Sequence, residues 1–424
     1  MVDPSSTFLR SPHVSRRLLS VSGVAMMLAL VAAGAGACGQ SGQSAASATC
    51  DSPGVSANEI RLGLLYPDTG PTATAVAAGR AGVDARIGLA NAKGGINGRK
   101  IVYEWRDDKD NPTTNATGAR NLIEQQNVFG VLEFSFVANG SAQYLADKGI
   151  PVGGLSIGDA WSKHPNMFSI GATTVSAIDL FGNFLKSEGA TRAAVVGTAL
   201  SAGTGDVTAV MTRSIQAAGI SVVDSIGYTA GADNPATVAQ RVAASGADTL
   251  MLLVSGSDLP TILTAVRAAA PKVRVIMSLA GYDRQLLAQA GPAMAGTVIP
   301  VFYRPFEAGG PAIDTFRQAM VTYAPQFPNP EQQLALISYI DTDLFLRGIE
   351  AAGPCPTRQA FMTGLRAVTN YDAGGLIAPL NIARDLGRQI TCWSFVQVNP
   401  AGNAFGVLRD SQCGQELPAA PGAG

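Results

Sequence analysis

Histidine is the residue that this chain nearly lacks. Its 424 residues include two, His13 and His164, and His13 lies in a segment that we expect to be removed. A metal site built from several histidines is therefore excluded, and a Ser–His or Cys–His couple could use only His164. We accordingly expect no histidine-dependent catalysis.

The chain also has no large excess of positive or negative charge. Thirty Lys and Arg residues stand against 31 Asp and Glu residues, so no basic face is available for nucleic acid. With 47% hydrophobic and 14% charged residues, the chain is too apolar for disorder and too evenly charged for a polytopic membrane protein. Its length predicts a soluble protein of two or three lobes.

Common cofactor and nucleophile motifs are absent or incomplete. Gly203-Thr204-Gly205 lacks the third glycine of a dinucleotide fingerprint, because Thr208 occupies that position. No phosphate-binding loop and no CxxC motif occurs. Gly154-Leu155-Ser156-Ile157-Gly158 has the spacing of a nucleophile elbow, but no histidine follows His164 to complete a triad. We predict no cofactor, no metal and a ligand-contacting turn around Ser156.

One acidic cluster, Asp107-Asp108-Lys109-Asp110, could be considered a metal or acid/base site. It ends a strand-like segment and precedes Asn111-Pro112, a combination typical of turns. We interpret it as a solvated turn.

The N-terminus has the parts of an export signal. Arg10, Arg16 and Arg17 precede an apolar run over residues 18–33, small residues follow, and then Cys38. Residues 1–37 resemble a bacterial lipoprotein signal, which implies lipidation of Cys38, and residues 38–57 form a flexible tether. A plain signal cleaved near Ala37, with Cys38 free, is the alternative. Both the general secretory and the twin-arginine export routes stay open.

Strand and helix patterns alternate along the mature chain. Two α/β lobes with parallel sheets are therefore expected. The expected strands are Ile60–Tyr66, Lys100–Trp105, Val128–Leu132, Ala193–Val196, Ser221–Ile226, Thr249–Val254, Val273–Met277 and Thr297–Phe302. The expected helices are Thr74–Ala92, Thr114–Gln126, Val207–Ala218, Pro235–Ser245 and Leu259–Ala270, followed by Ile313–Ala324, Pro330–Ala352 and Thr357–Val368. A hairpin of Thr391–Val398 and Ala404–Leu408 precedes a disordered tail over residues 417–424.

Ligands of open parallel sheets bind at the carboxyl ends of the strands. The loops expected there cover residues 66–72, 133–141, 153–159, 198–205, 255–258 and 278–283, and they contain small hydroxyl residues and glycines but no Arg or Lys. Such residues also cap helices, so each loop alone has a structural explanation.

Several short segments form one pattern: Ile60–Leu65, Thr69-Gly70-Pro71, Gly79, Gly82 and the run Asn91-Ala92-Lys93-Gly94-Gly95-Ile96-Asn97-Gly98-Arg99. In this pattern the chain resembles the extracellular solute-binding receptors of branched-chain amino-acid type ABC transporters. The resemblance implies a type I periplasmic binding protein fold of two doubly wound α/β lobes that close like a Venus flytrap, joined by three crossovers near residues 169–172, 301–303 and 375–379. It places the N-terminal lobe at 58–170 and 302–375, and the C-terminal lobe at 171–301 and 376–416.

The function implied is that of a monomeric, lipid-anchored receptor on the outer face of the cytoplasmic membrane, which captures a small solute and delivers it to an ABC permease. A subunit that senses the solute and signals to a membrane receptor or kinase is the alternative. Enzymatic activity is not expected.

The resemblance also assigns ligand-binding candidates. They are Tyr66, Glu133, Phe134, Ser135, Ser156, Ile157, Gly158, Ser201, Ala202, Ser255, Leu279 and Tyr282. Phe134, Ala202 and Leu279 depart from the family pattern of Ser, Tyr and Glu. Without that Glu, a buried ammonium lacks its partner unless Asp258 or Asp283 turns inward. We therefore expect a partly apolar, weakly charged solute.

Four cysteines remain if Cys38 carries lipid, and an even number in an exported chain suggests two disulfides. Since a bridge between the lobes would restrain the hinge, the lobe assignment favours Cys50–Cys355 and Cys392–Cys413. Cys355–Cys392 with Cys50–Cys413 is the alternative.

Overall fold

The structure is a computed structural model that describes residues 50–70, 72–171, 176–198, 202–229, 231–254 and 256–418. Cys38 and most of the expected tether lie outside these residues, as do Ser201, Ser255 and residues 419–424 of the expected tail.

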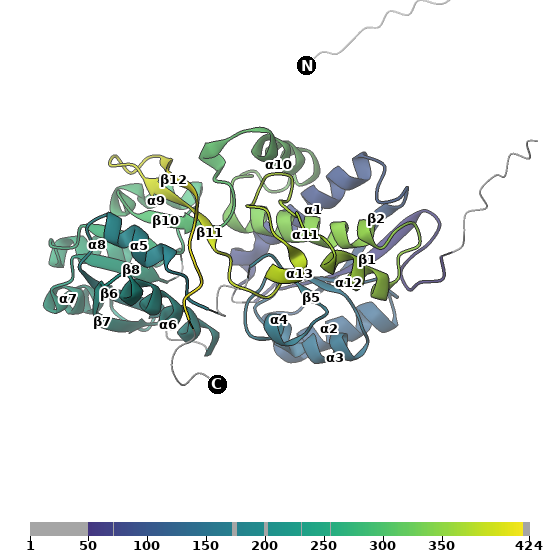
Figure 1. Ribbon diagram of the computed structural model, residues 1–424, viewed down its shortest axis with the longest axis horizontal. Coiled ribbons are helices and arrows are strands. Elements are labelled where there is room, and N and C mark those ends of the chain that lie inside the picture. The colour runs from purple at the N-terminus through teal and green to yellow at the C-terminus, as the bar shows by residue number, and fades with distance from the viewer. Residues whose placement is uncertain are drawn as a thin grey trace, which may run out of the picture. The chain divides into compact units, whose positions relative to one another are not determined.

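The first lobe is built on a five-stranded parallel sheet (Figure 1). Its order in space is β2 (Lys100–Asp107), β1 (Glu59–Tyr66), β3 (Val131–Glu133), β4 (Val152–Gly154) and β5 (Met167–Phe168). Successive residues of β1 face opposite sides. Leu64 packs into the cluster on the α1 side, and Leu65 packs into the cluster on the α2 side. Both faces of this sheet are therefore covered, as in other parallel sheets.

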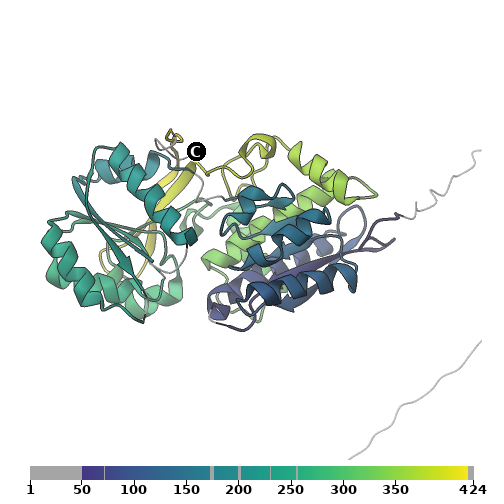
Figure 2. The ribbon, with the colours of Figure 1, turned by 90° about the horizontal axis from the view of Figure 1, so that it is seen from below.

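The second lobe is built on a seven-stranded sheet. Its order is β12 (Phe405–Cys413), β11 (Cys392–Val398), β10 (Val298–Val301), β9 (Val275–Ser278), β8 (Thr249–Leu253), β6 (Arg192–Thr198) and β7 (Ser221–Tyr228). The strands from β6 to β10 are parallel, and the hairpin of β11 and β12 adds to them in antiparallel orientation. Along β8, Leu250 and Leu252 enter one apolar cluster and Met251 the other, so helices cover both faces (Figure 2).

Helices complete the two lobes. The first lobe contains α1 (Ala73–Ala92), α2 (Pro112–Glu124), η1 (Ala138–Gly140), α3 (Ala142–Asp147) and α4 (Ala160–Lys163), and the second contains α5 (Leu180–Ser187), α6 (Ala202–Ala217), α7 (Pro235–Ser245), α8 (Leu259–Ala269) and α9 (Arg284–Met294). The remaining helices are η2 (Phe306–Ala308), α10 (Pro311–Tyr323), α11 (Gln333–Ala351), α12 (Arg358–Arg366) and α13 (Ile382–Asp385). Both α10 and α11 pack on α1, which returns this part of the chain to the first lobe.

The chain passes between the two sheets three times. It leaves the first sheet after β5, returns after β10, and leaves again before β11. The second and third passages pair with each other, because Tyr303 forms an antiparallel bridge with Ile377 and the amide of Arg304 donates to Leu376 (2.7 Å). The α/β fold of two doubly wound lobes expected from the sequence is confirmed.

Two disulfides are present, Cys50–Cys355 and Cys392–Cys413. The first ties the start of the described chain to the segment after α11, and the second joins facing residues of the β11–β12 hairpin. Both are the favoured pairings, and the alternative connectivity is wrong.

The acidic cluster after β2 is not simply a solvated turn. Asp108 is wholly buried and accepts hydrogen bonds from Asn115 (3.1 Å) and from the amide of Asp110 (3.0 Å). Asp107 in turn accepts from the amide of Thr69 (3.2 Å). The prediction was wrong for Asp108 because its carboxylate accepts from the turn before α2 and from Asn115 of α2, whereas Asp107 supplies the acceptor for the loop after β1.

Candidate ligand site

The candidate residues of the first lobe lie at one edge of its sheet. Leu65 pairs with Glu133 in the register of β1 and β3, and Glu133 pairs with Gly154 in that of β3 and β4. The carboxyl ends of β1, β3 and β4 are therefore neighbours, and the loops that follow them meet at this edge. The sequence expectation that these loops come together is met in this lobe.

Tyr66 makes its polar contacts within the lobe. Its hydroxyl donates to Asp68 and accepts from Nη1 of Arg80 (2.8 Å), while its ring lies 5.6 Å from that of Trp105. Burial and the bond to Asp68 raise the pKa of Tyr66 to about 12, so the phenol is neutral at physiological pH. A solute could bind this hydroxyl only by sharing it with Asp68 and Arg80.

Glu133 is wholly buried at the end of β3. Its carboxyl group accepts hydrogen bonds from Nδ2 of Asn115 (2.7 Å) and from the hydroxyl of Ser141 (3.2 and 3.3 Å). Burial, together with the nearby charge of Asp108, raises its pKa to about 8. Glu133 is therefore largely protonated at neutral pH. Its hydrogen bonds to Asn115 and Ser141 stabilise the loop that follows β3.

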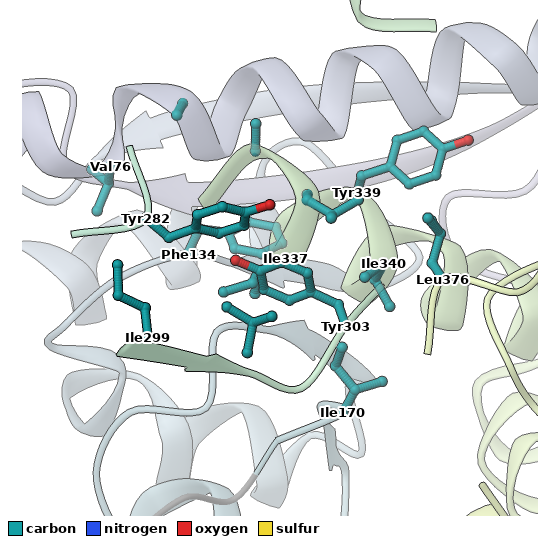
Figure 3. Packing of buried hydrophobic residues seen from close by; sticks show 14 of the residues in the cluster. Val76, Phe134, Ile170, Tyr282, Ile299, Tyr303, Ile337, Tyr339, Ile340 and Leu376 are labelled. Atoms are coloured by element: carbon teal, nitrogen blue, oxygen red, sulfur yellow. The ribbon is translucent and has the colours of Figure 1, made fainter. Parts of the chain in front are cut away.

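Phe134 and Ser135 are also buried. Phe134 packs in the main apolar cluster near Ile337 and Tyr303 (Figure 3). The Ser135 hydroxyl accepts a hydrogen bond from the amide of Val137 (3.1 Å), which closes a tight turn. Phe136 in the same loop is exposed to solvent, with an exposed fraction of 41%.

Ser156, Ile157 and Gly158 follow β4 and are only half-buried. The Ser156 hydroxyl has no hydrogen-bond partner in the described part of the chain. Gly158 has a φ of +82°, a conformation that other residues rarely adopt. Of the first-lobe candidates, this turn is the one whose polar side chain is not already engaged.

In the second lobe, the loop after β9 carries the other described candidates. Leu279 is half-buried against an apolar cluster. Tyr282 is buried, and its hydroxyl donates to Glu307 and accepts from the amide of Phe306 (2.8 Å). Burial and Glu307 raise the pKa of Tyr282. Ala202 begins α6, after β6.

A charged network that the sequence did not predict continues from Tyr282. Arg284 at the start of α9 pairs with Glu307 (3.1 Å) and with Glu331, and Glu331 also pairs with Arg317 of α10 (2.6 Å). The neighbouring Asp283 forms an antiparallel bridge with Gln332. These contacts connect the loop after β9 to the segments that flank α10. They join residues distant in sequence, and no local pattern indicates them.

Tyr303, in the second passage, was anticipated only as part of a crossover. It is buried beside Phe134 and Ile337, and its hydroxyl has no hydrogen-bond partner among the described residues (Figure 3). An unsatisfied buried hydroxyl costs roughly 1–3 kcal/mol, so an acceptor that reached this group would be stabilised by its hydrogen bond.

No group of His, Cys, Asp and Glu side chains within the described ranges could hold a metal ion. None of the helices described is long and apolar enough to cross a membrane.

Comparison with known proteins identifies one matching family and many solved structures of similar fold. A family model described as "Periplasmic binding protein" matches residues 59–403. The Leu/Ile/Val-binding protein homolog 7 of Brucella abortus is 40% identical over 74 residues, which are 17% of this chain and 18% of that relative. The chain thus matches less than a fifth of the relative's length.

Two of the solved structures with this fold illustrate the similarity. A branched-chain amino-acid ABC transporter protein from Thermus thermophilus with bound valine has a TM-score of 0.72 at 15% identity, with 84% of this chain and 97% of that chain covered. A solute-binding protein from R. palustris in complex with 4-hydroxybenzoate has a TM-score of 0.70 at 17% identity, with 85% and 98% covered. At these identities the similarity concerns the fold alone.

Proposed function

Because the chain belongs to the periplasmic binding protein family, we propose that it is an exported receptor that captures a small solute between its two lobes and delivers it to an ABC permease. The observation that carries the proposal is the extent of the family match, since residues 59–403 include every described strand except β12 and all three passages between the sheets. The family is one of binding proteins and not of enzymes. We propose that the receptor acts as a monomer.

The solute would contact the turn of Ser156, Ile157 and Gly158 on one side and Tyr303 at the second passage. Ser156 and Tyr303 both carry hydroxyl groups that bond to no other described residue, and the Tyr303 hydroxyl is buried. A solute acceptor at Tyr303 would therefore satisfy a donor that otherwise loses its hydrogen bond to water. Tyr66, Glu133, Phe134, Ser135, Ala202, Leu279 and Tyr282 would shape the site, together with Ser201 and Ser255.

We propose a partly apolar, weakly charged solute, such as an aromatic or short-chain acid or an organic amide. Leu279 stands where an ammonium-binding Glu would be needed, and Phe134 and Ile157 are apolar. Asp283 does not supply that charge freely, because its carboxylate caps α9 at the amide of Leu286 (2.8 Å). Tight binding of leucine, isoleucine or valine in calorimetry would contradict this assignment.

The test of capture is calorimetry with a panel of aromatic acids, short-chain acids, amides and amino acids. For the solute that binds, Tyr303→Phe should weaken binding by about tenfold, because one hydrogen bond is lost, without lowering the stability of the free protein. Tyr371→Phe is the control, since the Tyr371 hydroxyl donates to Ile340 (3.0 Å) and to Asp343 (2.9 Å) inside the lobe. That variant should lose stability and keep its solute affinity. Turnover of a substrate in place of reversible binding would overturn the proposal.

We further propose that Cys38 carries the lipid anchor. The supporting observation is the sequence itself, with small residues directly before Cys38 and a polar small-residue tract after it. Growth with labelled palmitate should label the wild-type protein in the membrane fraction. Cys38→Ser should abolish the label and release the protein, and a labelled Cys38→Ser variant would refute the anchor.

A further inference from the structure

One cavity lies at the passages between the sheets, not at the strand-end loops. It measures about 450 Å³. Its lining includes Ile170 from the first passage, Phe302 from the second and Ile377 from the third. None of the described ligand-binding candidates lines it. The cavity is therefore separate from the site proposed above.

One part of the cavity wall is apolar. Ile170, Ile377, Ile382 and Ile390 have exposed fractions of 4, 8, 3 and 8%, and Phe302 adds a half-buried ring. A volume of this size with such walls is typical of a site for a small molecule with an apolar body.

The cavity lining also includes two arginines with spare hydrogen-bond donors. Arg384 donates Nε and Nη2 to Asp385 (2.5 and 2.8 Å), and Arg388 donates Nη2 to Glu416 (2.6 Å). A guanidinium has five N–H groups, so each arginine keeps donors beyond these bonds. The two carboxylates, by contrast, already accept from the arginines. The polar part of the cavity therefore favours an acceptor head group over an ammonium.

We propose that this cavity is a second small-molecule site, which binds an amphiphile with an alkyl or aryl body and a carboxylate head. The body lies against Ile170, Phe302 and Ile390, and the head accepts from Arg384 and Arg388. Because the walls come from all three passages, a bound amphiphile contacts the segments that a movement of the lobes must bend.

The site can be tested with octanoate and octylamine, which share an apolar body and differ in the head group. Calorimetry on the whole mature chain should give saturable binding of octanoate and at least about tenfold weaker binding of octylamine. Ala378 lines the cavity and is half-buried. Ala378→Phe should fill the cavity and weaken octanoate binding by about tenfold or more. Ala116→Phe, at a half-buried position of α2 outside the cavity, should leave it unchanged.

A second pair of variants tests the head group and does not depend on the folding of Ala378→Phe. Arg388→Gln removes the donors of an ion pair whose side chains are 54 and 35% exposed. Arg409→Gln breaks the pair with Glu188, which is similarly exposed at 43 and 30% but lies outside the cavity. Octanoate affinity should fall at least about fivefold in the first variant and stay unchanged in the second. The absence of octanoate binding, equal binding of octylamine, or octanoate binding that neither Ala378→Phe nor Arg388→Gln affects would each overturn the proposal.

Discussion

Asp341, in the middle of α11, accepts a hydrogen bond from the backbone amide of Ile170 in the first passage (3.1 Å). The same oxygen accepts from the hydroxyl of Ser169 (3.3 Å), and the Asp341 side chain is buried and forms no ion pair with the described residues. Burial raises the pKa of Asp341 well above the usual range of a carboxyl group. A single buried carboxyl group thus accepts both hydrogen bonds that join the first passage to α11.

We predict that Asp341→Ala loosens this passage, whereas Asp341→Asn does not. The alanine leaves two donors without an acceptor, at a cost of about 1–3 kcal/mol, while the asparagine retains an acceptor oxygen. Hydrogen exchange of the Ile170 amide is the measurement, with faster exchange expected in the alanine variant. Equal protection in wild type and Asp341→Ala would show that the contact does not restrain the passage.

Glu133 should make stability depend on pH. Its pKa is about 8 in the folded protein, above the ordinary value of 4.5. The folded state therefore holds the proton more tightly, and the stability contributed by Glu133 is complete below about pH 4.5 and is lost as the pH rises toward 8, by about 1.4 kcal/mol per unit.

Glu133→Gln removes this ionisation. The free energy of unfolding of the wild type should fall relative to that of the variant between pH 4.5 and 8, and the difference should level off above 8, as followed by urea denaturation. Glu124→Gln, the same substitution at an exposed position of α2, is the matched control. If the free energy of unfolding changed with pH equally in Glu133→Gln and in the wild type, Glu133 would have an ordinary pKa in the folded protein.

The elements that the sequence predicted well are those with strong local patterns. The strand expected over Ile60–Tyr66 is β1 at Glu59–Tyr66, and the helix expected over Pro330–Ala352 is α11 at Gln333–Ala351. Long apolar segments bounded by charges, Gly or Pro determine such elements locally. The two-residue strand β5 was missed, because Met167 and Phe168 form a strand only by pairing with β4.

The same distinction applies to the candidate site. Which loops meet at the sheet edge follows from topology, so Glu133 and Ser156 could be placed at neighbouring strand ends. Topology does not show which of these side chains already form hydrogen bonds within the protein, because their partners are distant in sequence. Tyr282 bonds to Glu307, and Tyr66 bonds to Arg80. Only the packed structure distinguishes these engaged hydroxyls from that of Tyr303.

Arg284 should contribute a salt-sensitive share of stability. It pairs with both Glu307 and Glu331, whose side chains are 15 and 13% exposed, although Arg284 itself is 47% exposed. Arg284→Gln should lower the free energy of unfolding by about 1 kcal/mol at low salt, and by less at 0.5 M NaCl or so, because salt screens exposed charges. Arg347→Gln removes a single pair with Glu350 of 48 and 43% exposure and should have a smaller effect. Equal losses in the two variants, or a loss for Arg284→Gln that salt does not change, would contradict this view of the network.

Gly79 and Gly82 both lie in α1, but only Gly82 is required by packing. A Cβ at Gly82 would lie 2.1 Å from the carbonyl oxygen of Ala335 and 2.4 Å from Oγ of Ser338, so α1 and α11 would have to separate. A Cβ at Gly79 would meet its nearest atom, in Leu334, at 3.7 Å, which is ordinary contact. Gly82→Ala should therefore destabilise the protein by about 2–3 kcal/mol through overpacking.

Gly79→Ala should instead raise stability by about 0.5–1 kcal/mol, because alanine favours the helix over glycine. Urea denaturation of the two variants gives the comparison, with the same substitution in the same helix as its own control. Equal changes in both would mean that helix propensity, and not the approach of α11, sets the requirement for glycine. If Gly82→Ala lowers the free energy of unfolding and Gly79→Ala raises it, glycine is required at position 82 because α1 and α11 approach each other closely there.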